Sequence, residues 1–313
     1  MCELSVVIPC YKSELFLEKT VQDIELSLDN ISHEIILVDD SSPDKTYQVI
    51  EKIVKEHKNI VGISLARNFG QHAALMAGFR HAKGKLILCM DDDGQTPSSE
   101  ITKLLNAIND EIDVVYAKYG EKKHSFFRNI GSKLNSKMTE WLLKKPKDLY
   151  ISSFFVCKRY VVDEILRYEN AYPYVIGLVL RSTCRITNAK VNHMERAFGQ
   201  SGYSIIKLFS LWMNGFTAFS VKPLRIADLI GILLSLSGFV YAAYLIIKRL
   251  IIGYSFVVGW NSLMCVILII GGIIVLTLGL VGEYIGRIYI CSNKAPQYVI
   301  RKHCKNVTIQ NPL

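Results

Sequence analysis

The chain lacks the short motifs with which many proteins hold phosphates and metals. No GxGxxG follows its first apolar run and no GxxxxGK[ST] occurs anywhere, so no glycine-rich helix start is available to cradle a phosphate. Its 8 cysteines form no CxxC pair, and none lies at zinc-ligand spacing from another cysteine or a histidine. We therefore expect buried or idle thiols in a reducing compartment, and a different mode of phosphate or metal binding.

The amino terminus also lacks the features of an export signal. Residues 1–14, MCELSVVIPCYKSE, contain neither a basic start nor a long apolar run. We expect the bulk of the chain to remain in the cytosol.

Negative charge is scarce and apolar sequence is abundant. The 37 Lys and Arg residues outnumber the 28 Asp and Glu residues, the net charge is +9, and 50% of the residues are hydrophobic. A basic chain suits nucleic acid, an anionic membrane surface or a phosphorylated substrate. Because no basic-aromatic stripe or nucleic-acid motif is present, we favour the membrane and the phosphorylated substrate.

Two long apolar segments occur late in the chain, at residues 226–247 and 263–282. Each has about 20 residues, enough to cross a hydrocarbon core of ~30 Å. Basic residues are frequent on either side of the pair and scarce in the connecting loop, so the positive-inside rule predicts cytosolic flanks. Residues 205–225 are rich in aromatic side chains, which favours a helix lying at the membrane interface.

The first ~120 residues alternate short apolar runs with helical patterns, which predicts an α/β fold with a doubly wound, mostly parallel sheet. The runs at residues 5–9, 34–39, 60–65, 85–90 and 113–116 are rich in Val and Ile, as buried parallel strands are. Ligands bind beyond the carboxyl ends of such strands. The polar loops PCYKSE, DDSSPDKT, ARNFGQH and DDDGQTP all follow strand ends, so we expect them to converge on one site.

The last of these loops poses an electrostatic problem, because Asp91, Asp92 and Asp93 are adjacent and neighbouring carboxylates repel one another. A divalent cation such as Mg²⁺ or Mn²⁺ relieves the repulsion and can bridge the oxygens of a diphosphate. A solvated turn is the alternative that the residues alone leave open.

In combination, the loops resemble a known family. SVVIPCYKSE, EIILVDDSSPDKT and DDDGQTP are similar to the opening strand, the base-binding loop and the DxDxQ metal motif of family 2 glycosyltransferases with the GT-A fold. ARNFGQHAALMAGF, RAFGQSGYS and GEYIGRIY resemble segments of the polyprenyl-phosphate glycosyltransferases. That subfamily includes dolichol-phosphate mannose synthases and bacterial undecaprenyl-phosphate glucosyl- and aminoarabinosyltransferases. The similarity covers nearly the whole chain.

The resemblance implies a domain plan and a location. It implies a cytosolic GT-A catalytic domain at 1–204, an interfacial amphipathic helix at 205–225, a two-helix transmembrane region at 226–290 and a cytosolic tail at 291–313. It further implies a multi-pass protein of the bacterial inner membrane and a homotetramer.

The resemblance also implies roles for single residues. The residues expected to bind the nucleotide-sugar are Pro9, Tyr11, Glu14, Asp40, Arg67 and Asp91. The expected metal ligands for Mg²⁺ or Mn²⁺ are Asp91 and Asp93. The residues expected at the acceptor phosphate are Arg128, Arg196, Ser201 and Tyr203. The implied catalytic set is Asp91, Asp93, Gln95, Arg128 and Arg196. Asp92 occupies a position that the family often fills with alanine, so we expect it to be replaceable.

The implied reaction transfers a sugar from a UDP-sugar to undecaprenyl phosphate with inversion. A phosphate monoester is already ionised at neutral pH, so the acceptor needs no general base. Two alternatives remain. A processive polysaccharide synthase normally carries a QxxRW motif and more spans, and QxxRW is absent from this sequence. A non-catalytic membrane scaffold is disfavoured by the intact Asp91, Asp93, Gln95 and Arg196.

Two positions depart from the family pattern. Lys12 stands where Asn is usual, and Phe155 stands where relatives usually carry Arg. The second change removes a positive charge expected near the phosphates. Either Lys158, three residues further on, replaces that charge, or the donor preference differs from that of relatives.

Overall fold

The computed structural model describes residues 2–92, 97–119, 140, 145–192, 227, 229–233, 236–238, 240–241, 244, 247, 250–251, 260–293 and 295–306. The chain divides into two compact units, residues 1–202 with 294–313, and residues 203–293. Each unit is described by itself.

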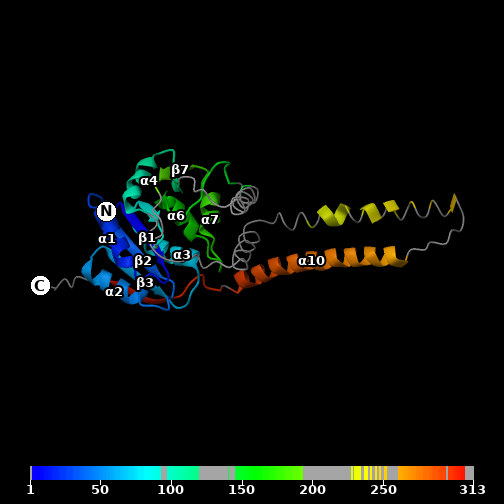
Figure 1. Cartoon of the computed structure of the whole chain (residues 1–313), viewed down its shortest axis with the longest axis horizontal. Helices are drawn as coiled ribbons and strands as arrows, with labels where there is room; N and C mark the ends of the chain where they lie inside the picture. Colours follow the sequence, from blue (N-terminus) through cyan, green and yellow to red (C-terminus); the bar gives the residue numbers. More distant parts are fainter. Residues whose placement is uncertain are drawn as a thin grey trace. The chain divides into compact units, whose positions relative to one another are not determined.

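The first unit is built on a sheet whose described strands follow the order β7-β5-β6-β4-β1-β2-β3-β8. Figure 1 labels four of these strands, β1, β2, β3 and β7. The strands are β1 (Leu4–Cys10), β2 (His33–Asp39), β3 (Ile60–Leu65), β4 (Leu86–Cys89), β5 (Val114–Tyr119), β6 (Phe155–Lys158), β7 (Ile186–Val191) and β8 (Ile300–Lys305). Among these strands, β6 and β8 run antiparallel to their neighbours and the other pairings are parallel. The predicted mostly parallel α/β sheet is confirmed, and the five predicted strands lie within a few residues of β1 to β5.

Helices cover both faces of this sheet. The helices are α1 (Leu17–Ser27), α2 (Thr46–Glu56), α3 (Gln71–His81), α4 (Ile101–Ala107), α6 (Arg159–Leu166) and α7 (Val175–Ser182), with the short 3₁₀ helix η1 (Ser98–Glu100) before α4. Side chains of α1, α2 and α4 join a buried cluster with alternate residues of the strands. Helix α3 packs against β1 and β2, and it contacts α6 and α7. The sheet is therefore buried on both sides, as its Val- and Ile-rich strands require.

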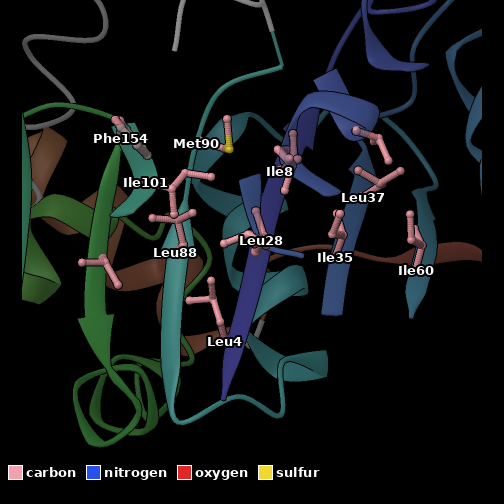
Figure 2. Packing of buried hydrophobic residues seen from close by; sticks show 14 of the residues in the cluster. Leu4, Ile8, Leu28, Ile35, Leu37, Ile60, Leu88, Met90, Ile101 and Phe154 are labelled. Atoms are coloured by element: carbon pink, nitrogen blue, oxygen red, sulfur yellow. The ribbon is translucent and has the colours of Figure 1, made fainter. Parts of the chain in front are cut away.

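Strand alternation divides β1 between the two faces. Leu4 and Ile8 point into the cluster shared with α1 and α2, where they lie beside Ile35, Leu37 and Leu88 (Figure 2). Val7, one residue before Ile8, points to the opposite face. A Cβ added to Gly78 of α3 would lie 2.3 Å from Val7 Cγ1. Glycine at this position lets α3 lie close to the sheet, which matters because α3 begins at the candidate site.

The carboxyl-terminal residues supply a strand that the sequence analysis did not predict. Residues 300–305, assigned there to the tail, form β8 and pair antiparallel with β3. The strand IRKHCK is basic and mostly exposed, so it lacks the apolar pattern by which the other strands were recognised. An edge strand with charged side chains is typical of sheet margins, where charge discourages pairing with other chains.

The second unit contains helix α10 (Trp260–Ser292), with 33 residues. Within the part of this unit that the structure describes, residues 269–292 form the one helix long and apolar enough to cross a membrane. A shorter apolar helix, Leu229–Gly238, lies in the first of the two predicted spans. The structure thus shows one candidate span in the described residues, where the sequence predicted two.

We predict that Gly84→Ala destabilises the first unit by about 1–3 kcal/mol, because the new methyl group overpacks a rigid site. A Cβ at Gly84 would lie 2.5 Å from the Ser5 amide nitrogen and 2.7 Å from the Leu4 carbonyl carbon, and backbone atoms cannot rotate away. Thermal unfolding of the purified protein in detergent measures the effect. Gly279→Ala is the matched control, since nothing lies within 4 Å of the added methyl group. Equal melting temperatures for the two variants would contradict the prediction.

Candidate active site

Four loops meet at one edge of the sheet, as predicted. Strands β4, β1, β2 and β3 are neighbours, run parallel and end at Cys89, Cys10, Asp39 and Leu65. The following loops are joined directly. Asp40 N–H donates to the Cys10 carbonyl at 3.0 Å, and Lys12 N–H donates to Ser42 Oγ at 3.1 Å. The parallel order therefore brings together segments that lie far apart in the sequence.

Two aspartates at the end of β2 hold the neighbouring loops. Asp39 accepts hydrogen bonds from Ser42 N–H at 2.9 Å and from the Ser64 hydroxyl at 2.9 Å. Asp40 is buried, and its two oxygens accept the N–H groups of Phe69 and Gly70 at 2.7 and 2.8 Å. Burial raises the pKa of Asp40, and these two hydrogen bonds oppose the rise. Asp40 thus fixes the loop that leads into α3.

The loop that Asp40 holds carries Arg67. The guanidinium carbon of Arg67 lies 4.6 Å from the centre of the Phe69 ring, a cation–π distance, and Arg67 itself is exposed. Gly70, which directly precedes α3, has a φ of +93°, a conformation that side chains other than glycine rarely adopt. The arrangement leaves the Arg67 guanidinium available at the edge where the loops meet.

The loop after β1 contains Tyr11, Lys12 and Glu14. Tyr11 is 46% exposed, and Glu14 accepts Lys45 N–H at 2.9 Å, which joins this loop to the start of α2. Lys12 has a φ of +60°. Asn, usual at this position in relatives, is among the residues that tolerate left-handed backbone best. Lys12 thus adopts a left-handed conformation directly after the exposed Tyr11.

Asp91 and Asp92, which follow β4, face different segments of the chain. Asp91 accepts Gln71 Nε2 at 2.8 Å and the Ser153 hydroxyl, so it faces α3 and the segment before β6. Asp92 Oδ2 accepts Tyr11 N–H at 3.2 Å and the Ser13 hydroxyl, so it faces the β1 loop. The two carboxylates therefore have different hydrogen-bond partners, although the charge of Asp91 still contributes to the raised pKa of Asp92.

The contacts of Asp92 differ from the expectation that this residue is replaceable. Burial raises its pKa to about 6, against the opposing effects of the hydrogen bonds from Ser13 and Tyr11. Asp92 is half-buried, and one of its carboxylate oxygens accepts two hydrogen bonds from the loop after β1. Replacing Asp92 with Ala would remove this acceptor from both donors.

Phe155 and Lys158 lie at opposite ends of β6. Phe155 pairs with Cys89 at the site end of β4, is buried, and packs on Tyr116 with ring centres 5.1 Å apart. Lys158 pairs with Leu86 at the other end of β4 and forms a 3.0 Å ion pair with Asp113. The proposal that Lys158 replaces the missing Arg charge is therefore wrong, because strand direction carries it to the far end of the sheet.

Several expected site residues lie outside the described part of the chain. They are Asp93, Gln95, Arg128, Arg196, Ser201 and Tyr203. Pro9, Tyr11, Glu14, Asp40, Arg67 and Asp91 are described, and all lie on the strand ends or loops of this edge. Among described residues, no group of three or more His, Cys, Asp or Glu side chains is placed to hold a metal ion.

His72, which the sequence indicated to be structural rather than catalytic, is a half-buried residue near the carboxyl ends of the strands. It is the second residue of α3, next to Gln71, and its ring contacts Tyr174 edge-on with centres 5.0 Å apart. Its Nδ1 is enclosed and has no hydrogen-bond partner within the described structure. Burial lowers the pKa of His72 to about 4. The burial of His72 becomes visible only in the packing of α3 on α7. A single histidine forms no sequence motif from which its burial could be predicted.

Comparison with known proteins gives matches over nearly the whole chain. Residues 5–166 match the model described as glycosyl transferase family 2, and residues 222–288 match the model described as GtrB C-terminal hairpin. A curated protein of Aeromonas hydrophila, named undecaprenyl-phosphate 4-deoxy-4-formamido-L-arabinose transferase, is 33% identical over 97% of this chain and 95% of its own length. A protein of the same name from Yersinia enterocolitica is 33% identical over 96% of this chain and 93% of its own length.

Solved structures of glucosyl-3-phosphoglycerate synthase from Mycobacterium tuberculosis share the fold. The complex with UDP has a TM-score of 0.52 at 15% identity, covering 70% of this chain and 79% of that chain. The complex with Mn²⁺, UDP-glucose and phosphoglyceric acid has a TM-score of 0.52 at 15% identity and covers 70% of this chain and 78% of that chain. At this identity the likeness supports the GT-A-like α/β fold alone.

We predict that His72 makes the fold sensitive to acid. Because its folded-state pKa of about 4 lies below the ordinary value of 6.5, the unfolded chain binds more protons between these pH values. Stability is therefore full above pH 6.5 and falls as pH drops towards 4, by on the order of 1–3 kcal/mol. His72→Phe keeps a ring against Tyr174 and should flatten this part of the profile. Thermal unfolding from pH 7 to pH 4 checks the prediction, and parallel profiles for the two proteins would refute it.

Proposed function

The chain belongs to glycosyltransferase family 2, and from this we propose that it transfers a sugar from a UDP-sugar to undecaprenyl phosphate with inversion at the anomeric carbon. The observation that carries the proposal is the likeness to the named undecaprenyl-phosphate transferases, which spans nearly the full length of both chains. That likeness includes the carboxyl-terminal region as well as the sheet, so it extends beyond the nucleotide-binding fold alone.

The carboxyl-terminal region is proposed to anchor the enzyme in the bacterial inner membrane. Helix α10 supplies one apolar span, and the match to a hairpin model over 222–288 supports a second span at 226–247. Two spans return the chain to its starting side, which agrees with β8 completing the same sheet as β1. This proposal includes a cytosolic site and a homotetramer. It also includes the expected domain boundaries, which are 1–204, 205–225, 226–290 and 291–313.

The described loops suit a nucleotide donor. The exposed Tyr11 ring offers an aromatic surface for a base, while Glu14 and the remaining lone pairs of Asp40 offer acceptors. Pro9 lies on β1, directly before this loop. Arg67 supplies a guanidinium group for phosphate oxygens, which it binds as a planar fork. Base and ribose are therefore proposed to lie over the ends of β1 and β2.

A divalent cation fits the donor side of the site. Carboxylate oxygens are the ligands that Mg²⁺ and Mn²⁺ favour, and Asp91 and Asp93 would hold the ion with Gln95 beside them. When bound, it would offset the charge that develops on the departing diphosphate. Gln71 and Ser153 each donate to one oxygen of Asp91, so the orientation of this carboxylate is set by the protein.

The acceptor needs no proton removed, because a phosphate monoester is ionised at neutral pH. Catalysis then depends on holding the phosphate oxygen in line with the anomeric carbon. Arg128 and Arg196 would bind the acceptor phosphate, with the hydroxyls of Ser201 and Tyr203 as further donors. Attack from the side opposite to the diphosphate inverts the anomeric configuration.

The reaction is tested with purified protein, undecaprenyl phosphate, Mg²⁺ or Mn²⁺, and a panel of UDP-sugars. We expect one donor to yield a lipid carrying a single sugar, detected by mass spectrometry as a mass increase of one glycosyl unit. A polymer would instead favour the processive synthase. No lipid-linked product from any donor, together with no metal-dependent binding of UDP, would favour a scaffold.

We predict that Asp93→Ala lowers kcat/KM by about 100-fold or more, because it removes a carboxylate ligand of the metal that stabilises the leaving group. The assay is initial-rate transfer with the preferred donor at saturating Mn²⁺. Asp110→Ala is the matched control, because Asp110 is an exposed aspartate on the loop before β5. Equal rates for the two variants would overturn the metal role of Asp93.

A further inference from the structure

Asp92 connects the loop after β4 to the loop after β1 through hydrogen bonds. In the proposed donor site these two loops bind different parts of the nucleotide-sugar. The Oδ2 atom of Asp92 accepts Tyr11 N–H at 3.2 Å and also the hydroxyl of Ser13. Residues 91–93 are the proposed diphosphate side, and residues 11–14 are the proposed base side. The contact therefore connects the two ends of the donor site across some 80 residues of sequence.

The link continues beyond Ser13 into the loop before α2. Ser13 is buried, and its N–H donates to Thr46 Oγ1 at 2.8 Å. Thr46 is fully buried, and its hydroxyl donates to Asp44 at 2.6 Å. A chain of hydrogen bonds thus runs from the β4 loop through the β1 loop to the β2 loop. The middle of this chain, Ser13 and Thr46, is buried, and a broken link there would leave a polar group unpaired.

We propose that Asp92 is a positioning residue, which fixes the Tyr11–Ser13 loop against the β4 loop so that both grip one nucleotide diphosphate. This inference rests on the proposed function. The base and the diphosphate of a nucleotide are separated by a fixed covalent distance, so the loops that hold them must keep a matching separation. A shift of one loop against the other weakens donor binding without removing any group that contacts the donor.

The geometry distinguishes this role from metal ligation. Both donors bind the same oxygen of Asp92. Asn at this position offers one carbonyl oxygen of the same shape, which can accept both hydrogen bonds, whereas Ala offers none. A neutral amide oxygen binds a divalent cation more weakly than a carboxylate does, so Asn would replace a metal ligand only poorly. Asp92→Asn should therefore rescue what Asp92→Ala loses.

The test compares wild type, Asp92→Ala, Asp92→Asn, Ser13→Ala and the double variant Asp92→Ala/Ser13→Ala in three measurements. Calorimetry gives Kd for UDP with Mn²⁺, and initial rates give donor KM, acceptor KM and kcat. Hydrogen exchange of peptides covering residues 10–14 reports on the loop itself, without ligand.

We expect Asp92→Ala to raise UDP Kd and donor KM about tenfold, with acceptor KM and kcat within about twofold of wild type. Asp92→Asn should stay within about threefold of wild type throughout. The double variant should be little worse than Asp92→Ala, since Ser13 and Asp92 act through one contact. Exchange at residues 10–14 should rise in Asp92→Ala and return towards wild type in Asp92→Asn.

Three results would overturn the inference. Unchanged exchange at residues 10–14 in Asp92→Ala would show that the contact does not hold the loop, whatever the protein binds. Equal losses in Asp92→Asn and Asp92→Ala would indicate a role for the charge. A fall in kcat with unchanged donor KM would place Asp92 in the chemical step. Failure of the proposed function is separate, because wild type would then bind no UDP while the exchange comparison still decides the loop contact.

Discussion

The parallel pairing of β4, β1, β2 and β3 is the constraint on which the candidate site depends. The carboxyl ends of neighbouring parallel strands lie at the same end of the sheet. The loops that follow Cys89, Cys10, Asp39 and Leu65 therefore lie next to one another. Each strand also had to be apolar on both faces, because helices cover both sides of the sheet. Polar residues are then confined to the strand ends, and this confinement concentrates the carboxylates, hydroxyls and the Arg67 guanidinium at one place.

The adjacent aspartates are tolerated because the chain sends them to different partners. Val7 of β1 pairs with Cys89 of β4, and Asp91 follows Cys89 by two residues. Asp91 accepts a hydrogen bond from Gln71 of α3, whereas Asp92 accepts one from Tyr11 in the loop after β1. The carboxylates of Asp91 and Asp92 each accept hydrogen bonds from donors on other segments. Donors stabilise the charged forms and reduce the repulsion that the sequence DDD alone implies. The sequence motif indicates the glycosyltransferase family. The structure adds that Asp91 and Asp92 contact different segments of the chain.

The sequence was sufficient for the parallel core and for the convergence of its loops, because both follow from short apolar runs and strand direction. It was insufficient for β8, whose basic edge strand has no apolar alternation, and for His72, whose burial comes from the packing of α3 on α7. It also misplaced Lys158, since closeness in sequence to Phe155 hid the fact that β6 carries the two residues to opposite ends. The contacts of Asp92 were not predicted, because resemblance to a motif that often carries Ala at this position cannot show which partners an Asp has in this chain.

Phe155 places an apolar ring at the site end of β6, where the family resemblance led us to expect Arg. Its ring is buried against Tyr116, directly beside the end of β4, so the charge that Arg would bring is replaced by apolar packing. Under the proposed function, phosphate binding would depend on Arg67, Arg128 and Arg196 and on the proposed metal, without a charge at position 155. This places greater weight on the geometry of the loops that Asp40 and Asp92 hold.

The most direct test of the account is an experimental structure of the full chain with UDP and Mn²⁺. The account predicts uracil and ribose against the loops after β1 and β2, near Tyr11 and Asp40, with the diphosphate and Mn²⁺ beside the β4 loop at Asp91. UDP bound elsewhere, or a diphosphate remote from Asp91, would contradict the claim that the parallel strand ends form one donor site.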